Sequence, residues 1–399
     1  MADVPRVLFV LFEGLADTVI DSQVLDHARD MAIAGVANFE IWAFACDDAL
    51  HARSLEKRDA AAERAGAPVR VLRGVRPLMP GGEAINAHRL DAALARYRPA
   101  FDILHARTDY TAAVCARLRD RDRFTLVWDC RGDAVAEMQA RAAAAPPPYR
   151  PLFALRARAL AGTRRRAARG CDRAAFVSRP LHDLAQPLIG DKPAIVTHCA
   201  ASERHFGFDP DRRRRMRATL GYAEGQTVHV YSGSLAPYQC FDETVALFRS
   251  VRDADPAARL LVLCPDAAGA RQRIAGLDPA DVTVIAASHA AVNGYLNAAD
   301  IAIMLRQPSP LNHVSSPTKF AEYCLAGLPV VMTEAVHDAA AQARRLGNLV
   351  AADLAAGTCA TPQVTDRAAL AAAARKRLGK ASLVPLYRAL YIGTETNAG

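Results

Sequence analysis

The chain has 399 residues, 51% of them hydrophobic and 23% charged, a composition typical of a globular protein and not of a disordered one. This length exceeds one ordinary core and suits two domains of roughly 200 residues each. The 50 basic and 42 acidic residues give a formal net charge of +8. That balance favours an anionic ligand or surface and does not indicate nucleic-acid binding.

Cysteine usage and the first apolar run indicate the compartment. The nine cysteines are scattered and never form C-x-x-C, which argues against a disulfide framework or a thiolate zinc site and favours a reducing compartment. The apolar run 7–12 is too short for a signal-peptide core or a membrane span. We therefore expect a cytoplasmic location, with peripheral contact at the inner face of an anionic membrane as an open alternative.

Short β-branched and aromatic runs alternate with alanine-rich helical stretches along nearly the whole chain. Most of these runs are continuously apolar, as in strands buried on both faces, so their repetition predicts parallel sheets covered by helices. The expected strands of the first half are 6–12, 39–45, 68–72, 102–105, 124–129, 174–178 and 194–198. Those of the second half are 227–233, 259–264, 282–286, 300–305 and 329–333.

The strand series starts again at residue 227, after a polar segment, 200–225, that includes the arginines at 212–215. We interpret the region around residue 200 as an interdomain linker and these arginines as solvent-facing charge. The expected fold is α/β, with two Rossmann-like domains facing each other across a cleft. The expected boundaries are 1–200 and 201–382, followed by a tail, 383–399, whose short amphipathic stretch should dock on a domain.

Several familiar motifs are absent. No G-x-G-x-x-G follows the first strand, so the sequence lacks the usual motif for binding a nicotinamide or flavin dinucleotide. No G-x-x-x-x-G-K-[ST] occurs either, which excludes the P-loop NTPases. D-x-D occurs at 120–122, 209–211 and 253–255, each time in a charged helix or loop instead of at the end of an apolar strand. Metal-dependent chemistry therefore has no support in the sequence.

The most informative segment follows a buried strand that is expected to end at Arg306. A helix should then begin with Ser316 as its N-cap and Pro317 as its first residue. Ser316, Lys319 and Glu322 recur every three residues and form a polar stripe. The helix N-terminus with Lys319 and Arg306 predicts a diphosphate cradle at a strand's carboxyl end. Glu322 could accept hydrogen bonds from both hydroxyls of a ribose.

The alternative for this segment is a surface helix. Lys319 and Glu322 would then form an exposed pair worth only about 0.3–0.5 kcal/mol.

The run that starts at Ser316 reads S-P-T-K-F-x-E-Y-x-x-x-G-x-P-V. It resembles the donor-binding signature of GT-B glycosyltransferases, specifically glycosyltransferase family 4. Residues 231–239 match the first strand and loop of that family's C-terminal domain. Residues 21–24, 105–107 and 129–132 resemble N-terminal landmarks of its bacterial polysaccharide-type members.

The resemblance implies a GT-B fold whose second domain holds a nucleotide-sugar donor, while the first holds a glycan or lipid-linked acceptor. It also implies transfer with retention of anomeric configuration, no metal or other cofactor, and a C-terminal helix that returns to the first domain. Arg306 and Lys319 would stabilise the departing diphosphate. The donor-binding residues would be Gly233, Ser234, Gln239, Asn312, Ser315, Ser316, Pro317, Thr318, Lys319 and Glu322.

This chain departs from the family pattern at three positions. Val314 stands where a glutamate is common, and the neutral Ser234 and Gln239 stand where the family has an arginine and a lysine for the diphosphate. Arg306 and Lys319 could supply the missing charge. A non-catalytic nucleotide-sugar-binding relative and a nucleotide-sugar epimerase therefore remain as alternatives.

Candidate acceptor-side residues follow the expected strand ends of the first half: Glu13, Gly14, His105, Arg107, Asp109, Asp129 and Arg131. We expect His105, Arg107 and Asp109 to point into the interdomain cleft, with Asp109 as a base toward an acceptor hydroxyl. Gly14 would let the backbone approach the diphosphate. The alternatives are a histidine satisfied in the core and a structural ion pair between Asp129 and Arg131.

One helical stretch is strongly cationic. Its arginines are Arg156, Arg158, Arg164, Arg165, Arg166 and Arg169, interspersed with large apolar residues. Such a stretch could hold the protein at an anionic leaflet close to a lipid-linked acceptor. A solvated arginine-rich face is the alternative.

Overall fold

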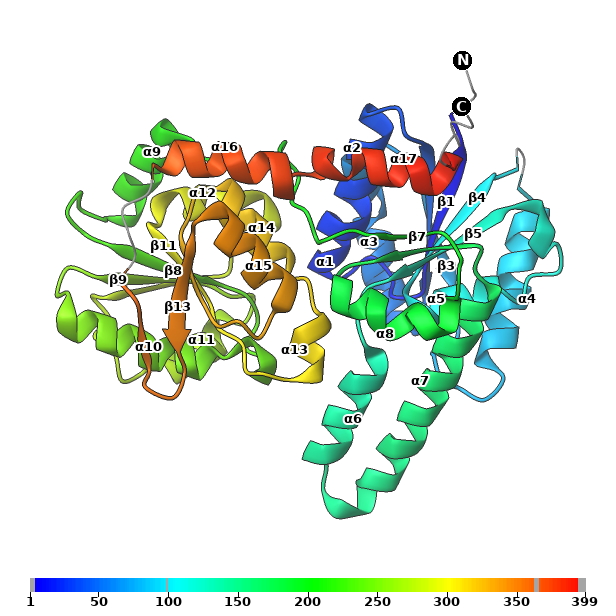
Figure 1. The fold of residues 1–399 in the computed structure, drawn as a ribbon, viewed down its shortest axis with the longest axis horizontal. Helices are drawn as coiled ribbons and strands as arrows, with labels where there is room; N and C mark the ends of the chain where they lie inside the picture. The colour runs from blue at the N-terminus through cyan, green and yellow to red at the C-terminus, as the bar shows by residue number, and fades with distance from the viewer. Residues whose placement is uncertain (1–3, 98–99, 362–365, 394–399) are drawn as a thin grey trace. The chain divides into compact units, whose positions relative to one another are not determined.

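The computed structural model describes residues 4–97, 100–361 and 366–393 (Figure 1). The chain forms two compact units. The first unit consists of Met1–His198 together with Leu383–Gly399, and the second unit of Cys199–Ser382. Each unit is built around its own seven-stranded sheet, which helices cover.

The first sheet is parallel throughout and has the strand order β3-β2-β1-β4-β5-β6-β7. This is the order of a Rossmann-like fold, extended by one edge strand. Its strands are β1 (Arg6–Leu11), β2 (Asn38–Ala45), β3 (Val69–Arg73), β4 (Ile103–Arg107), β5 (Thr125–Cys130), β6 (Arg173–Phe176) and β7 (Ala194–Val196).

The second sheet repeats this topology with the order β10-β9-β8-β11-β12-β13-β14, and only β14 runs antiparallel to its neighbour. Its strands are β8 (Val228–Ser232), β9 (Arg259–Leu263), β10 (Val282–Ile285), β11 (Ile301–Met304), β12 (Val330–Met332), β13 (Leu349–Asp353) and β14 (Thr358–Cys359). All twelve expected strands are present, and β13 and β14 were not anticipated. The predicted fold class, two Rossmann-like α/β domains, is confirmed.

Helices connect the strands of both units. The α-helices of the first unit are α1 (Thr18–Ile20), α2 (Asp26–Ile33), α3 (Asp48–Ala65), α4 (Gly82–Ala95), α5 (Thr108–Cys115), α6 (Ala134–Ala144), α7 (Arg150–Gly170), α8 (Arg179–Ile189) and α17 (Val384–Ile392). Those of the second unit are α9 (Pro210–Leu220), α10 (Phe241–Ala254), α11 (Ala267–Arg273), α12 (His289–Ala298), α13 (Pro310–Val314), α14 (Thr318–Leu325), α15 (His337–Leu346) and α16 (Arg367–Leu378).

Short 3₁₀ turns at Arg121–Arg123, Pro147–Tyr149, Pro237–Gln239 and Lys380–Leu383, and a π-helical turn at Asp21–Leu25, complete the elements. Among the described residues, no helix has both the length and the apolar character needed to cross a membrane.

Both faces of the second sheet are buried, which explains its continuously apolar strands. Val230 packs in the cluster that contains Phe320 of α14, whereas its neighbour Tyr231 packs in the cluster that contains Phe248 of α10. Successive residues of a strand point to opposite faces, so each face of the sheet contributes to a separate core.

The C-terminal helix α17 packs within the first unit. The centre of the Tyr387 ring lies 4.3 Å from that of the His27 ring, and the Tyr391 hydroxyl lies 3.0 Å from His105 Nδ1. Both tyrosines are buried, so this short helix supplies aromatic side chains to the core of the unit.

The two units divide between His198 and Cys199, close to residue 200, and the segment 200–225 belongs to the second unit. Within it, Asp209 is the N-cap of α9, and its carboxylate accepts hydrogen bonds from the backbone N–H groups of Asp211 and Arg212. The interpretation of the whole arginine run as solvent-facing charge is wrong for Arg213, which is partly buried, although its three neighbours in the run are exposed.

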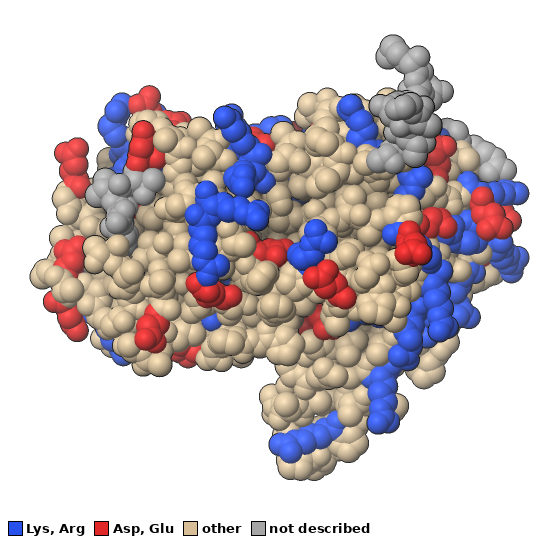
Figure 2. Space-filling view, in the orientation of Figure 1, with Lys and Arg blue, Asp and Glu red and all other residues tan. Residues whose placement is uncertain are grey.

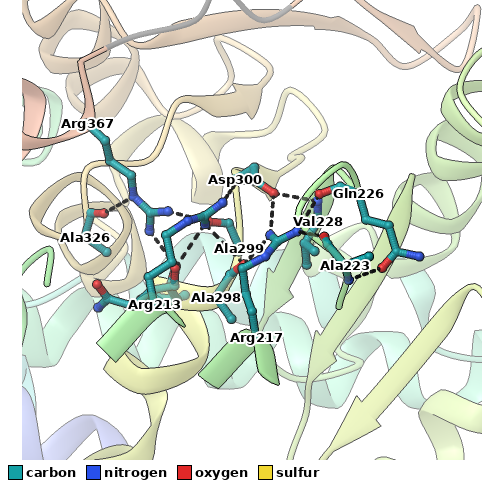
Figure 3. Close-up of polar contacts among 12 residues, drawn as sticks. Arg213, Arg217, Ala223, Gln226, Val228, Ala298, Ala299, Asp300, Ala326 and Arg367 are labelled. Atoms are coloured by element: carbon teal, nitrogen blue, oxygen red, sulfur yellow. Dashed lines mark hydrogen bonds and ion pairs between the residues drawn. The ribbon is translucent and has the colours of Figure 1, made fainter. Parts of the chain in front are cut away.

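Arg213 and Arg217 of α9 fasten this helix to the amino end of the sheet (Figure 3). Both donate to the carboxylate of Asp300, over N–O distances of 2.5 and 3.0 Å. Arg367 of α16 donates to the carbonyl oxygens of Leu296, Ala299 and Ala326, and burial lowers the pKa of its guanidinium to about 9. These guanidiniums cap the carboxyl ends of α12 and α14, where the last carbonyl oxygens have no hydrogen-bond partner within their own helix.

Candidate functional site

The strand order of the second sheet reverses at β8, which lies between β9 and β11. In open α/β sheets, ligands bind outside the carboxyl ends of the strands at such a switch point. Here the carboxyl ends belong to Ser232 of β8 and Met304 of β11, and the residues that follow each of them contribute to one polar cluster.

This switch-point cluster consists of Arg306, Lys319 and Gln239. Lys319 Nζ donates to the backbone oxygen of Ser232 at 2.7 Å and to Gln239 Oε1 at 2.6 Å. Arg306 Nη2 donates to the same Oε1 at 2.7 Å, and Arg306 Nη1 donates to the carbonyl of Leu305 at 2.9 Å. A single amide oxygen thus serves two cations that come from different elements.

The cluster is electrostatically unbalanced. Arg306 is only 2% exposed, and Lys319 is partly buried. Burial lowers the pKa of the Lys319 ammonium well below its ordinary value, and the adjacent Arg306 lowers it further. Burial also lowers the pKa of Arg306. Their shared acceptor, Gln239, carries no net charge, so an anion at this position would relieve an unfavourable arrangement.

The backbone leaves little space around the cluster. Gly233 has φ +157°, and a Cβ atom there would lie 2.7 Å from Lys319 Nζ and 3.2 Å from Gln239 Oε1. Lys319 Nζ also lies 5.1 Å from the centre of the Tyr231 ring, whose hydroxyl donates to the Ser234 carbonyl. Glycine is therefore required at 233 for the lysine to reach Ser232.

Helix α14 begins one residue later than the sequence predicts. Its N-cap residue is Pro317, which has no side chain to cap with, and its first helical residue is Thr318. The expectation of Ser316 as N-cap is wrong, because its hydroxyl accepts the backbone N–H of Cys199 at 2.8 Å instead of an N–H of α14. The first N–H groups of α14 consequently have no side-chain cap.

Glu322 lies one turn further along α14 and is 8% exposed. Its Oε1 is 3.6 Å from Nε2 of His289 on α12. An exposed Lys319–Glu322 surface pair is therefore not what the structure shows, since Glu322 is buried, Lys319 is partly buried, and the two side chains contact different partners.

The polar residues just before α14 form hydrogen bonds with one another. Ser309 caps the unanticipated short helix α13, Asn312 Nδ2 donates to the Gln307 carbonyl at 2.8 Å, and the Ser315 hydroxyl donates to the Asn312 carbonyl at 2.9 Å. Asn312 and Val314 are buried. These contacts shape the turn that leads into α14.

Sequence reasoning missed two members of this site. Tyr323 is fully buried, its hydroxyl accepts the N–H of Ser232 at 2.9 Å, and burial raises its pKa above the usual range. Tyr231 lies beneath Lys319. Both tyrosines were part of the quoted sequence patterns, but a tyrosine inside an apolar run does not by itself reveal a polar role.

No protein-family model and no curated protein sequence matches the chain. Solved structures do. Sucrose-phosphate synthase from Thermosynechococcus elongatus is 14% identical, with a TM-score of 0.61 over 98% of this chain and 100% of its own. Anabaena HepE in complex with UDP and glucose is 15% identical, with a TM-score of 0.61 over 96% and 98%. Starch synthase IV from Arabidopsis thaliana, bound to ADP and acarbose, is 10% identical, with a TM-score of 0.60 over 98% and 99%.

The chain has the GT-B fold. The predicted resemblance to GT-B glycosyltransferases is thereby confirmed at the level of the fold, and family 4 stays a prediction.

The first unit of this GT-B protein has its own switch point, between β1 and β4. Arg107 is 4% exposed and forms an ion pair with Glu13. It also donates a hydrogen bond of 2.8 Å to Oε1 of Gln23, which belongs to the π-helical turn. Gly14 has φ +64°, and a Cβ there would lie 2.7 Å from the Ser54 hydroxyl. Packing within the unit thus accounts for this glycine, and no approaching diphosphate is needed to explain it.

His105 is a core residue, so the expectation that it points into an open cleft is wrong. It is fully buried between the Tyr391 hydroxyl and the Asp129 carboxylate, whose Oδ2 lies 3.3 Å from His105 Nε2. Arg131 donates to the same Oδ2 at 2.7 Å. Burial works to raise the pKa of Asp129, but Arg131 and His105 hold it below its usual range. The structural ion pair is the arrangement observed.

Asp109 is also buried, and it faces Arg164 instead of solvent. Arg164 Nε donates to Asp109 at 3.0 Å and Arg164 Nη2 donates to Asp133 at 2.8 Å. Burial raises the pKa of Asp109 despite this guanidinium. Arg166 is held by Glu83. Arg164 is therefore internal and does not contribute to a membrane-facing or solvated arginine-rich surface.

Proposed function

We propose that the protein is a glycosyltransferase that takes its sugar from a nucleoside diphosphate donor bound by the second unit. The observation that carries the proposal is the switch-point cluster, in which Arg306 and Lys319 share one neutral acceptor, Gln239 Oε1. A diphosphate oxygen would replace that amide oxygen and receive charge-assisted hydrogen bonds from both cations. Two of the structures named above, HepE with UDP and glucose and starch synthase IV with ADP and acarbose, were solved with a nucleoside diphosphate, which supports a ligand of this kind.

The chemistry proposed for the cluster is electrostatic. The bond between the anomeric carbon and the diphosphate oxygen breaks, a bond from that carbon to an acceptor hydroxyl oxygen forms, and the hydroxyl proton is released. Negative charge accumulates on the departing diphosphate, where Lys319 and Arg306 would stabilise it. Because the two side chains supply the positive charge themselves, we further propose that binding requires no divalent cation. Retention of configuration and membership of family 4 belong to the same proposal.

The remaining donor contacts are proposed from their places around the cluster. Glu322, whose carboxylate oxygens can accept hydrogen bonds, would take the ribose hydroxyls. The other donor-side residues are Gly233, Ser234, Asn312, Ser315, Ser316, Pro317 and Thr318. A glycan or lipid-linked acceptor would bind the first unit, where Glu13 and Arg107 mark the switch point.

Titration calorimetry of the full chain with UDP, ADP and GDP, with and without EDTA, tests the binding part of this proposal. We expect at least one diphosphate to bind equally well in both conditions. Transfer from the matching nucleotide sugar, followed by release of the diphosphate, tests the activity. A strict requirement for magnesium in binding and turnover would remove the metal-free mechanism, and absence of binding to every nucleotide would remove the donor site.

A non-catalytic nucleotide-sugar-binding protein is the second candidate. It is favoured by Gln239, Ser234 and Val314, since none of them contributes a charge to the site. The two candidates differ in one measurement. A protein that binds the nucleotide sugar tightly, but neither hydrolyses nor transfers it with any glycan acceptor, is the binding protein.

A further inference from the structure

Helices α6 and α7 form a hairpin that extends beyond the sheet of the first unit (Figure 1). The two helices pack along each other and are joined by a proline-rich turn. We call residues 146–158, the turn and the start of α7, the hairpin tip. All of these residues are exposed except Phe153, which is partly buried, and Ala157, which is buried.

The hairpin tip exposes an unusual concentration of large apolar side chains. Tyr149 is 58% exposed, Leu152 is 46% and Leu155 is 64%. Among the described residues, twelve large apolar side chains are exposed, and three of these twelve lie within the seven positions 149–155. Leu152 and Leu155 are three residues apart, so they lie on one side of α7. Single exposed leucines are ordinary, whereas a cluster at the end of a projection indicates a contact surface.

The charges around these side chains have one sign. Between Glu137 and Asp172 the sequence has eight arginines and no acidic residue. Arg141, Arg150, Arg156 and Arg158 lie in or near the tip and are exposed. Figure 2 shows the end of the hairpin with blue and tan atoms and no red on this face. Arg164 and Arg166, nearer the base, have acidic partners within the unit and do not belong to this surface.

We propose that the hairpin tip docks the protein on an anionic lipid bilayer. Tyr149, Leu152 and Leu155 would enter the boundary between headgroups and acyl chains, and the arginines would lie against lipid phosphates. Aromatic and apolar side chains mixed with basic ones are the composition that this boundary favours. The proposal does not depend on the nucleotide site, because vesicle binding is measured without any nucleotide.

The apolar component favours lipid over nucleic acid. A nucleic acid would be held by arginines through its phosphates, and exposed leucines would add little to that contact. An open surface pocket of about 600 Å³ lies beside the hairpin tip. Arg156 of the tip lines this pocket together with Arg76, Met79 and Met138. Cations beside apolar side chains thus extend from the tip onto the body of the first unit.

Sedimentation of the full chain with vesicles tests the proposal. Vesicles of phosphatidylcholine alone are compared with vesicles that also contain phosphatidylglycerol, at low and at high salt. We expect binding only to the anionic vesicles. Each neutralised arginine should weaken it roughly fivefold, so R150Q/R156Q/R158Q should lose about a hundredfold. L152S/L155S should lose about tenfold or more.

Matched controls separate a tip-specific effect from a general one. Leu184 of α8 is 46% exposed, as Leu152 is, and L184S should bind like the parent. R117Q/R119Q/R123Q removes the same net charge at exposed positions elsewhere in the unit and should change binding less than threefold.

The proposal is wrong if the parent protein does not bind anionic vesicles. It is also wrong if L152S/L155S leaves vesicle binding unchanged, since the leucines would then take no part. Binding to RNA or heparin that needs the arginines but not the leucines would assign the tip to a polyanion instead of a bilayer.

Discussion

Replacing Gln239 by alanine is the sharpest perturbation of the switch-point cluster. In the structure the Gln239 amide oxygen accepts hydrogen bonds from Lys319 at 2.6 Å and from Arg306 at 2.7 Å. Q239A removes this acceptor and leaves both donors in place. The unbound protein should lose stability, whereas a diphosphate complex, in which a phosphate oxygen takes over both hydrogen bonds, should not.

The expected magnitude follows from the geometry. Hydrogen bonds to charged groups contribute about 1.5–3 kcal/mol each when buried. Gln239 is only partly buried, so water would replace part of the lost contact, and we expect a net loss of about 1–2 kcal/mol in the free energy of unfolding. Because the complex is unaffected, diphosphate affinity should rise by up to the same amount, roughly 5- to 30-fold.

Q239E should act in the opposite direction. A carboxylate between the two cations would stabilise the unbound protein and compete with the phosphate, so diphosphate affinity should fall. Denaturant unfolding without ligand and calorimetric titration with UDP or ADP measure the two quantities separately. If Q239A is as stable as the parent and binds diphosphate no more tightly, or if Q239E binds it more tightly, the proposed exchange of amide for phosphate is wrong.

Three further predictions concern other charged groups. Burial and Arg306 lower the pKa of Lys319 in the free protein, so the ammonium loses its proton as pH rises through the interval between that lowered pKa and the ordinary value near 10.5. Diphosphate affinity should therefore fall across this interval while the contribution of Lys319 to stability rises, and Lys319→Met should abolish both trends in pH-dependent titrations. E322Q should weaken nucleotide binding about ten- to a hundredfold, whereas a 2′,3′-dideoxy nucleotide should bind parent and variant alike in the same calorimeter. R164Q removes the guanidinium between two buried carboxylates, so the free energy of unfolding measured with denaturant should fall by about 3–5 kcal/mol. The exposed control R165Q should lower it by less than about 0.5 kcal/mol. Comparable losses in the two variants would contradict the internal role of Arg164.

The strands could be predicted because their burial leaves a direct mark on the sequence. A strand covered on both faces is a continuous apolar run; most of the expected strands are such runs, and all twelve are present. β13 escaped because its Leu349-Val350 start leads into alanines, which occur equally in the helices of this chain. β14 has only two residues and is defined by its pairing with β13, which a local pattern does not contain.

The site could be predicted in part. The pattern around Lys319 correctly placed it with Arg306 near a strand end, since strand, loop and helix are consecutive in the chain. Tertiary partners decided the rest. Ser316 caps no helix because Cys199, 117 positions away, uses its hydroxyl. Arg164 and His105 were expected at surfaces, but their partners come from other elements of the unit.

Lys319→Met offers the most direct test of the central claim, that Lys319 and Arg306 hold a diphosphate at the switch point. The full-length parent and the variant are titrated with UDP and uridine, and with ADP and adenosine. The account predicts that the variant loses about ten- to a hundredfold in affinity for the diphosphate that the parent binds, and almost nothing for the matching nucleoside. An equal loss for both ligands, or unchanged diphosphate affinity, would contradict it.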